Sequence, residues 1–435
     1  MNICIVGVGY VGLVSGTCFA EFGYNVFCVD NDEKKIDALK EGVIPIYEPG
    51  LQEMVKRNQQ AGRLQFTTDL AQAVQRSLVI FIAVGTPSDS EGSANLEYVY
   101  QVAETVGKLM DGYKIVVTKS TVPVGTGKEI QRIIKENQEK EVPFDVASNP
   151  EFLREGAAIE DFMRPNRVVI GTDSEQATAI MKDLYSPLYL IETPFVITNV
   201  ETAEMVKYAS NAFLATKISF INEMANICEL VGADVHQVAK GMGLDRRIGP
   251  KFLHPGPGYG GSCFPKDTRA IVNLANTLGY RFKIVESVIE VNEDQARRMV
   301  AKIERALGSL DGKKLGVLGL TFKPNTDDIR ESPALSIITA LIAKGAKVAA
   351  FDPAGMQAAR ESVNTIEYVE DMYAAAKDAD AFVTATEWNE FRYLDWDRIK
   401  KLMRNPVVVD LRNIYEPSRM KARGFDYHCV GRSYE

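Results

Sequence analysis

The first 30 residues alternate between short apolar runs and small or polar breaks, which predicts a strand, a helix and a second strand. Residues 3–6 form an apolar, β-prone run, and a helix-like stretch then continues to Phe22. Gly23 follows it directly, as is typical of a helix C-terminus. The next apolar run, residues 25–29, predicts the second strand.

The turn between the first strand and the helix contains Gly7, Gly9 and Gly12 in G-x-G-x-x-G spacing. Such glycines let the backbone turn tightly and approach a pyrophosphate at the helix N-terminus. Asp30 ends the second strand, where a carboxylate accepts hydrogen bonds from a ribose diol. A tight turn without a ligand is the alternative, and the complete strand–helix–strand context favours a dinucleotide site.

Three later apolar runs continue the α/β pattern, at residues 77–84, 114–121 and 144–151. Ligands of open parallel sheets lie outside the C-terminal ends of the strands. Thr86, Thr121 and Glu151 are therefore candidates to face one crevice. The alternative is that these side chains cap the helices that follow them.

Residues 200–231 have apolar positions at helical spacing and contain neither glycine nor proline. A helix of this length measures about 45 Å, which suits it to separate two α/β units and to pack against a second subunit. Lys207 and Asn211 lie one turn apart and share a face. Lone Lys and Asn residues on helices are usually solvated, but apolar residues surround these two.

Residues 249–267 contain so much glycine and proline that we expect a shaped loop without helix or strand. Cys263 lies in this loop and is followed closely by Lys266 and Asp267. A neighbouring ammonium favours the nucleophilic thiolate. The other five cysteines lie in apolar runs or near the C-terminus, where a free cysteine is commonly a small buried hydrophobe.

A second α/β unit begins at Lys313. Its strand and helix pattern resembles that of the first unit, but a charged loop carrying Lys323 and Arg330 replaces the glycine turn. The charges of this loop indicate that it binds a different anionic ligand, or that it contributes to the same crevice as the strand ends of the first unit. The alternative is a plain scaffold with a charged loop.

The composition excludes several classes of protein. The chain has 435 residues, enough for about three units, with 46% hydrophobic and 25% charged residues, which excludes a disordered chain. With 50 Lys and Arg against 58 Asp and Glu, the net charge is −8. Nucleic acid is therefore not an expected partner, and anionic ligands need local cations or helix N-termini.

The apolar runs are all too short for a membrane helix, and the N-terminus has no signal-peptide pattern. We therefore expect a cytoplasmic protein that does not bind membranes, with six reduced cysteines. Three histidines and no CxxC pattern give no support for a metal site.

Eight blocks of sequence resemble the nucleotide-sugar 6-dehydrogenase family over essentially the whole chain. They are GVGYVG (7–12), VGTP (84–87), STVPVGT (120–126), NPEFLREG (149–156), KYASNAFLATKISFINE (207–223), DRRIG (245–249), GPGYGGSCFPKD (256–267) and FKPNTDDIRESP (322–333).

The resemblance implies an α/β fold of two Rossmann-like, doubly wound domains joined by a long central helix that forms the core of a homodimer. We assign residues 1–198 to an NAD-binding domain, 199–308 to a central helical domain with the substrate loop, and 309–435 to a UDP-sugar-binding domain.

The resemblance also implies a chemistry, in which a sugar 6-hydroxymethyl group becomes a carboxylate with two NAD molecules used in turn. Cys263 is then the nucleophile that carries a thioester. Lys207 and Asn211 stabilise the sugar oxygen, Asp267 and Thr121 position water or move the alcohol proton, and Glu151 is the base for hydrolysis.

The remaining contacts are implied in the same way. The residues expected to contact NAD are Gly7, Gly9, Val11, Gly12, Asp30, Lys35, Thr86, Thr121, Glu155, Lys266 and Arg330. The residues expected to hold the UDP-sugar are Glu151, Phe152, Leu153, Arg154, Glu155, Lys207, Asn211, Phe252, Leu253, His254, Pro255, Gly256, Gly260 and Lys323. Arg247 is expected to reach the substrate of the partner subunit.

Among the sugars, UDP-glucose is favoured because DRRIGPKFL precedes the cysteine loop as in that branch of the family. GDP-mannose is an alternative, since its dehydrogenases share the GGSC-PKD loop, and UDP-N-acetylmannosamine fits less well. A non-catalytic nucleotide-sensing dimer on the same fold is an alternative of a different class. The intact set of Cys263, Lys207, Asn211 and Asp267 argues against it, because a sensor needs no nucleophile.

Overall fold

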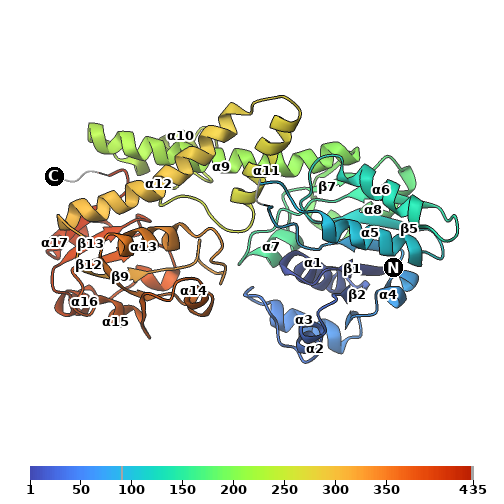
Figure 1. Cartoon of the computed structure of the whole chain (residues 1–435), viewed down its shortest axis with the longest axis horizontal. Coiled ribbons are helices and arrows are strands. Elements are labelled where there is room, and N and C mark those ends of the chain that lie inside the picture. The colour runs from blue at the N-terminus through green and yellow to red at the C-terminus, as the bar shows by residue number, and fades with distance from the viewer. Residues whose placement is uncertain (90–91, 433–435) are drawn as a thin grey trace. The chain divides into compact units, whose positions relative to one another are not determined.

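The computed structural model describes residues 1–89 and 92–432 of the chain. It divides into two compact units, Met1–Ser210 and Asn211–Glu435 (Figure 1). The division falls within one helix, between Ser210 and Asn211.

The first unit is built on an eight-stranded sheet with the order β3-β2-β1-β4-β5-β6-β7-β8. All neighbouring strands run parallel except β6 and β7, which are antiparallel. The strands are β1 Asn2–Val6, β2 Asn25–Val29, β3 Leu64–Thr67, β4 Val79–Ile82, β5 Lys114–Thr118, β6 Phe144–Ser148, β7 Val168–Gly171 and β8 Phe195–Thr198. The strands expected at residues 3–6, 25–29, 77–84, 114–121 and 144–151 are therefore present.

Helices connect these strands. They are α1 Tyr10–Glu21, α2 Glu33–Lys40, α3 Leu51–Gln60, α4 Leu70–Arg76, α5 Glu97–Leu109, α6 Thr126–Asn137, α7 Ala158–Met163, α8 Glu175–Leu184 and the 3₁₀ segment Ser186–Ile191. Central strands such as β4, with the sequence VIFI, are buried along their whole length, as the strands of a parallel sheet covered on both faces are. Asp32, Asp69 and Ser174 cap three of the helices with their own side chains.

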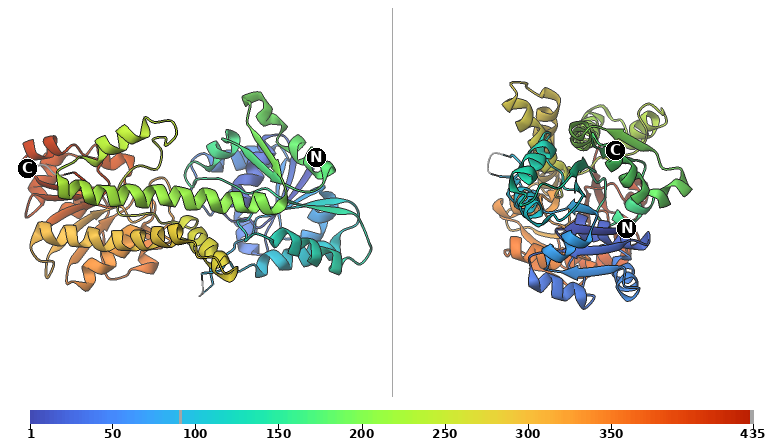
Figure 2. Two further views of the ribbon diagram at one scale, coloured as in Figure 1. Left: turned by 90° about the horizontal axis from the view of Figure 1, so that it is seen from above. Right: turned by 90° about the vertical axis from the view of Figure 1, so that its right-hand side faces the viewer.

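The long helix α9 spans Val200–Val231 without interruption (Figure 2). These are the bounds that the apolar spacing predicts. In its second half, Ile221, Ala225 and Cys228 pack into the core of the second unit. Phe213, Phe220 and Ile227 recur every seven residues and are 65%, 47% and 49% exposed.

The second unit contains a six-stranded, fully parallel sheet with the order β11-β10-β9-β12-β13-β14. This is the doubly wound order in which ligands bind where the strand order reverses. Its strands are β9 Lys314–Leu318, β10 Lys347–Phe351, β11 Glu367–Tyr368, β12 Ala381–Thr384, β13 Val407–Asp410 and β14 Asp426–Cys429. Its helices after α9 are α10 Val235–Gly243, α11 Phe264–Thr277, α12 Lys283–Leu307, α13 Pro333–Ala343, α14 Met356–Ser362, α15 Met372–Ala376, the 3₁₀ segment Asn389–Arg392, α16 Trp396–Leu402 and α17 Pro417–Ala422.

One expectation for the cysteine loop was wrong. We expected residues 249–267 to contain no helix, but α11 begins at Phe264. Pro265 lies in the first turn, where a missing N–H costs no hydrogen bond and the fixed φ suits a helix. The proline therefore starts a helix here, and Cys263 becomes its N-cap residue.

Within the described residues, no helix combines the length and the apolar character that crossing a membrane requires.

Candidate active site

The glycine turn after β1 has the geometry of a pyrophosphate cradle. A Cβ atom on Gly12 would lie 1.9 Å from the carbonyl oxygen of Gly7, so only glycine allows α1 to approach the turn this closely. Gly9 is the N-cap of α1 and offers no side-chain cap to the first N–H groups of the helix. Uncapped N–H groups at a helix N-terminus bind an anion, and the turn therefore fits a dinucleotide.

Asp30 lies directly after β2, beside this turn. Its carboxylate accepts hydrogen bonds from the backbone N–H groups of Val8 (2.9 Å) and Asp32 (3.2 Å), and from Lys35 Nζ (3.1 Å). Burial alone would raise the pKa of Asp30, but these donors together lower it. Asp30 is thus an ionised acceptor at the place where a ribose is expected.

The structure brings Thr86 and Thr121 together. Thr86 Oγ1 donates a hydrogen bond to the main-chain oxygen of Thr121 at 3.0 Å. The alternative that Thr86 and Thr121 are helix caps is wrong, because α5 and α6 begin at Glu97 and Thr126 without a side-chain cap from their own N-cap residues. Both threonines follow strands that end at the same edge of the sheet, β4 and β5.

Glu151, expected at the same edge after β6, is buried and paired with Lys207 of α9. Lys207 Nζ lies 2.8 Å from Glu151 Oε1 and 2.7 Å from its main-chain oxygen, and the N–H of Leu153 donates to Glu151 Oε2 at 2.5 Å. Burial alone would raise the pKa of Glu151, but Lys207, the N–H of Leu153 and Lys119 lower it. The helix-capping alternative for Glu151 is also wrong, because its two carboxylate oxygens accept hydrogen bonds from Lys207 and from the N–H of Leu153.

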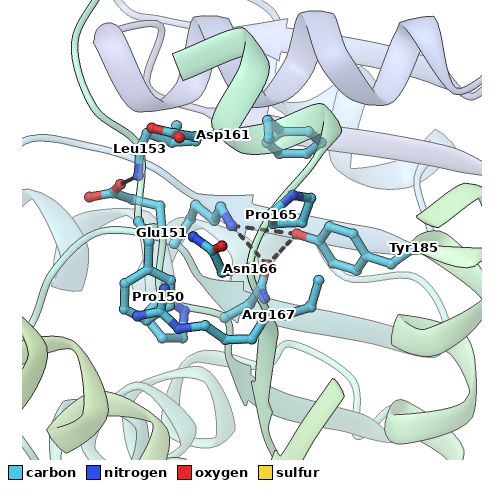
Figure 3. A pocket seen from close by; sticks show the side chains of 13 residues that line it. Pro150, Glu151, Leu153, Asp161, Pro165, Asn166, Arg167 and Tyr185 are labelled. Carbon is cyan, nitrogen blue, oxygen red and sulfur yellow. Dashed lines mark hydrogen bonds between the residues drawn. The ribbon is translucent and has the colours of Figure 1, made fainter. Parts of the chain in front are cut away.

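Glu151 and Leu153 line a pocket in the first unit, together with Phe152 and Arg167 (Figure 3). The Phe152 ring stacks against the Arg167 guanidinium at 3.5 Å, and Lys207 Nζ lies 5.4 Å from the same ring. Arg154 forms a bidentate pair with Asp161, donating from Nε to Oδ2 and from Nη2 to Oδ1, and thereby ties the segment after Glu151 to α7.

A second anchor holds the same segment. Glu48 accepts hydrogen bonds from the N–H groups of Gly156 (2.7 Å) and Ala158 (2.8 Å), and it forms a short hydrogen bond with Tyr10. Glu48 therefore caps α7 from a remote loop and ties it to the first turn of α1. Neither Glu48 nor Tyr10 was predicted from the sequence, because their hydrogen-bond partners lie far away along the chain.

Three residues that line the pocket, Lys119, Asn149 and Tyr185, were also not predicted from the sequence. Lys119 is buried, and its Nζ donates to Asn149 Oδ1 (3.0 Å) and to the hydroxyl of Tyr185 (3.4 Å). Tyr185 in turn donates to Asn149 Oδ1 at 2.6 Å (Figure 3). The available signal was a lysine directly after an apolar strand, in the sequence KIVVTKST.

In the second unit, the residues around Cys263 gather at the start of α11. Asp267 is buried, accepting a hydrogen bond from Asn211 Nδ2 at 2.6 Å and from Lys266 Nζ at 2.7 Å. The Cys263 thiol is partly exposed, with Ser262 Oγ 3.6 Å from its sulfur. A helix N-terminus favours negative charge, so this position suits a thiolate.

The segment before the cysteine is held closely against the rest of the second unit. The N–H of Gly256 donates to Asn222 Oδ1 at 2.8 Å, and Leu253 is buried. A Cβ atom on Gly260 would lie 2.2 Å from the main-chain oxygen of Glu331, which no larger residue could tolerate. Phe252 adopts a left-handed backbone conformation, with φ of 66°, a strained geometry that clusters at binding sites.

Three of the other expected residues, Arg247, Arg330 and Lys323, contact residues close to them along the chain. Arg247 forms an ion pair with Asp245 and Arg330 with Asp328, and both arginines are exposed. Lys323 Nζ lies 5.4 Å from the Phe322 ring. In the first unit, the structure thus brings Gly7, Asp30 and Lys35 together, and separately Thr86 with Thr121 and Glu151 with Lys207. In the second unit it brings Asn211, Asp267 and Lys266 together beside Cys263.

The glycine turn, Asp30 and the strand order define the first unit as a dinucleotide-binding α/β domain. The whole chain belongs to the UDP-glucose/GDP-mannose dehydrogenase family. The NAD binding domain of the family matches residues 1–189, its central domain residues 201–294, and its UDP binding domain residues 316–417.

Several UDP-glucose dehydrogenases are similar to this chain over nearly its whole length. It is 55% identical to a UDP-glucose 6-dehydrogenase of Rhizobium meliloti (strain 1021), over 99% of this chain and 100% of the relative. It is 52% identical to UDP-glucose 6-dehydrogenase TuaD of Bacillus subtilis (strain 168), over 99% and 93%. The solved structure of a UDP-glucose dehydrogenase from Pyrobaculum islandicum has a TM-score of 0.92 and 41% identity, covering 99% of this chain and 98% of that one.

Proposed function

We propose that this protein catalyses the NAD-dependent, four-electron oxidation of UDP-glucose to UDP-glucuronate. The observation that carries the proposal is the 55% identity, over 99% of this chain and 100% of the relative, to a UDP-glucose 6-dehydrogenase. Bound NAD supplies a hydride acceptor, once for each of the two oxidation steps.

In the first step, the sugar C6 alcohol loses a proton and a hydride and becomes an aldehyde. Lys207 and Asn211 donate to the sugar oxygen as negative charge develops on it. Asp267 and Thr121 position water or move the alcohol proton. The ion pair of Lys207 with Glu151 holds that ammonium in a fixed position before substrate arrives.

In the second step, the Cys263 thiolate adds to the aldehyde carbon to give a thiohemiacetal. Loss of a second hydride from C6 and of the hydroxyl proton leaves a thioester on Cys263. Glu151 then takes a proton from water, which attacks the thioester carbonyl and releases the carboxylate and the Cys263 sulfur. The lowered pKa of Glu151 keeps this base ionised at neutral pH.

The remaining features belong to the same proposal. Residues 1–198, 199–308 and 309–435 form the NAD-binding, central and UDP-sugar-binding parts, and the protein is cytoplasmic. The chain forms a homodimer, and the exposed apolar side chains of Phe213, Phe220 and Ile227 on α9 support this arrangement.

The test is an assay of NADH formation with UDP-glucose, GDP-mannose and UDP-N-acetylmannosamine. UDP-glucose should react fastest and yield two NADH per sugar. A faster reaction with either other sugar would overturn the substrate assignment, and binding without NADH would favour the sensing dimer.

The covalent step is tested with Glu151→Gln, which keeps size and hydrogen bonding but removes the base. Losing a general base costs about 10²–10⁴-fold in rate, so the acyl-enzyme should accumulate after a burst of about two NADH per site. Mass analysis should locate the glucuronyl nucleotide on Cys263, and hydroxylamine should release it. Cys263→Ala should form neither adduct nor uronate, and uronate formation by this variant at near wild-type rate would contradict the covalent route.

A further inference from the structure

The pocket of the first unit contains a buried charge that the reaction scheme above does not use. Lys119 follows β5 directly and is 4% exposed. Its two hydrogen-bond acceptors, Asn149 Oδ1 and the Tyr185 hydroxyl, are both neutral. A buried ammonium is costly unless a nearby negative charge offsets the loss of water.

The negative charge available in this pocket is Glu151. Lys119 and Glu151 line the same pocket, together with Arg167 and Asp161. Asp161 is already paired with Arg154, and the Arg167 guanidinium lies against the Phe152 ring. Burial lowers the pKa of Lys119 to about 8, and the charge of Glu151 opposes that shift. The ammonium therefore persists at neutral pH and acts on Glu151.

Glu151 needs this second cation because its first one has two tasks. Lys207 donates to Glu151 Oε1 and to its main-chain oxygen, and in the proposed reaction it also donates to the sugar oxygen. When negative charge develops on the sugar, it competes with Glu151 for the same ammonium and raises the cost of keeping the carboxylate ionised. The scheme gives Lys119 no role at the sugar, and two of its three N–H donors are used by Asn149 and Tyr185.

We propose that Lys119 is a positioning residue whose buried ammonium keeps Glu151 ionised, and thus competent for hydrolysis, while Lys207 serves the sugar oxygen. The proposal rests on the proposed function, since it takes Glu151 as the base that hydrolyses the acyl-enzyme. Asn149 and Tyr185 contribute by holding the ammonium in place. Asn149 is itself fixed, because its Nδ2 donates to the main-chain oxygen of Val169 at 2.8 Å.

The test is the pH dependence of acyl-enzyme decay. Single turnovers are quenched at successive times, and intact-protein mass spectrometry measures the fraction of acyl-enzyme that remains. Lys119→Met removes the charge at similar size, and Lys119→Gln removes it while retaining a hydrogen-bonding group if the first variant folds poorly. In the wild type, the decay rate should fall at low pH as Glu151 becomes protonated, which gives the acid limb of the pH profile. In the Lys119 variants, the midpoint of this limb should move to higher pH by about one unit. Below the wild-type midpoint, decay should be about tenfold slower, while the rate at high pH and the pH dependence of the first NADH step should change little.

Lys114→Met is the matched control. Lys114 is also a buried lysine, but it is the first residue of β5 and lies at the opposite end of the strand from Lys119. Its Nζ donates to the main-chain oxygen of Gln75 and pairs with Asp111. Its removal should leave the acid limb unchanged.

The outcomes separate the two proposals. If Glu151→Gln hydrolyses the acyl-enzyme as fast as the wild type, Glu151 is not the base and the proposed hydrolysis step is wrong. If the acid limb depends on Glu151 but stays in place in both Lys119 variants, the role of Lys119 is overturned. Slower decay at every pH, without a shift of the limb, would show that Lys119 only supports the pocket structurally and would also overturn it.

Discussion

Glu204 of α9 caps helix α6 through Gly127. Glu204 Oε1 accepts a hydrogen bond from the N–H of Gly127 at 2.8 Å, and its Oε2 accepts one from Gly125 at 2.7 Å. A carboxylate from 77 residues further along the chain therefore does what a local N-cap residue usually does. Gly125 lies in the same connection between β5 and α6 as Thr121.

The first prediction is that Glu204 makes the protein less stable as pH rises. Burial raises the pKa of Glu204 from 4.5 to about 7, although both N–H groups oppose the shift. Between these values the unfolded chain releases the proton and the folded protein keeps it. The free energy of unfolding should therefore fall by about 3 kcal/mol as pH rises through this window, at ~1.4 kcal/mol per unit.

Glu204→Gln removes this titration. Melting temperatures of the variant and the wild type should be measured from pH 4.5 to 8. As pH falls, the melting temperature of the wild type should rise relative to that of the variant. A constant difference across the range would contradict the prediction.

The second prediction concerns the choice between NAD and NADP. The ionised Asp30 should repel a 2′-phosphate, and we expect NAD to be favoured by about 2 kcal/mol, roughly thirtyfold in kcat/KM. Because Lys35 pairs with Asp30, Asp30→Ala should free that ammonium for the phosphate and narrow the preference. Asp32→Asn, at a neighbouring carboxylate that caps α2, is the control and should leave the preference intact. Comparable kcat/KM for the two cofactors in the wild type would be evidence against this role of Asp30.

The third prediction concerns the pair beside the cysteine. Lys266 is the ion-pair partner of Asp267, whose side chain is 1% exposed. Lys266→Met should cost about 3 kcal/mol of stability, because it leaves a buried charge without its partner. The double variant Lys266→Met/Asp267→Asn should recover much of that loss in thermal unfolding. Arg281→Met breaks an exposed pair with Glu286 and should cost less than about 1 kcal/mol. Equal losses in the two single variants would rule out this account.

The fourth prediction concerns Arg247, whose exposed side chain is paired with Asp245. If it reaches the substrate of the partner subunit, Arg247→Ala should raise the KM for the sugar nucleotide about tenfold, the cost of a charge-assisted hydrogen bond, and leave the KM for NAD nearly unchanged. Arg246→Ala is the neighbouring control and should alter neither. Co-expression with Cys263→Ala should then restore part of the activity in mixed dimers. Loss of mainly NAD affinity would show that the assignment is wrong.

The sequence alone was sufficient for the class of fold and for five strands of the first sheet, but β3, β7 and β8 were not predicted from it. The bounds of β2 and α9 match the apolar patterns, because periodicity and helix-stop signals are local properties of a chain. It was also sufficient to select Asp30 and Glu151, because parallel strands bring their C-terminal ends to one edge of a sheet. The start of α11 was not predicted, because a high glycine and proline content indicates a loop, although a single proline is favoured in the first turn of a helix.

Only the tertiary structure decided which groups meet. Thr86, Thr121 and Glu151 could each have been helix caps by sequence, but Glu48 and Glu204, from distant segments, cap α7 and α6 instead. In the sequence, Lys119 is one more lysine that follows a predicted strand. Only the folded structure shows that it is buried and that it contacts Asn149 and Tyr185. The physical reason is that hydrogen bonding and burial set the charge and the position of a side chain, and the partners that provide them are distant along the chain.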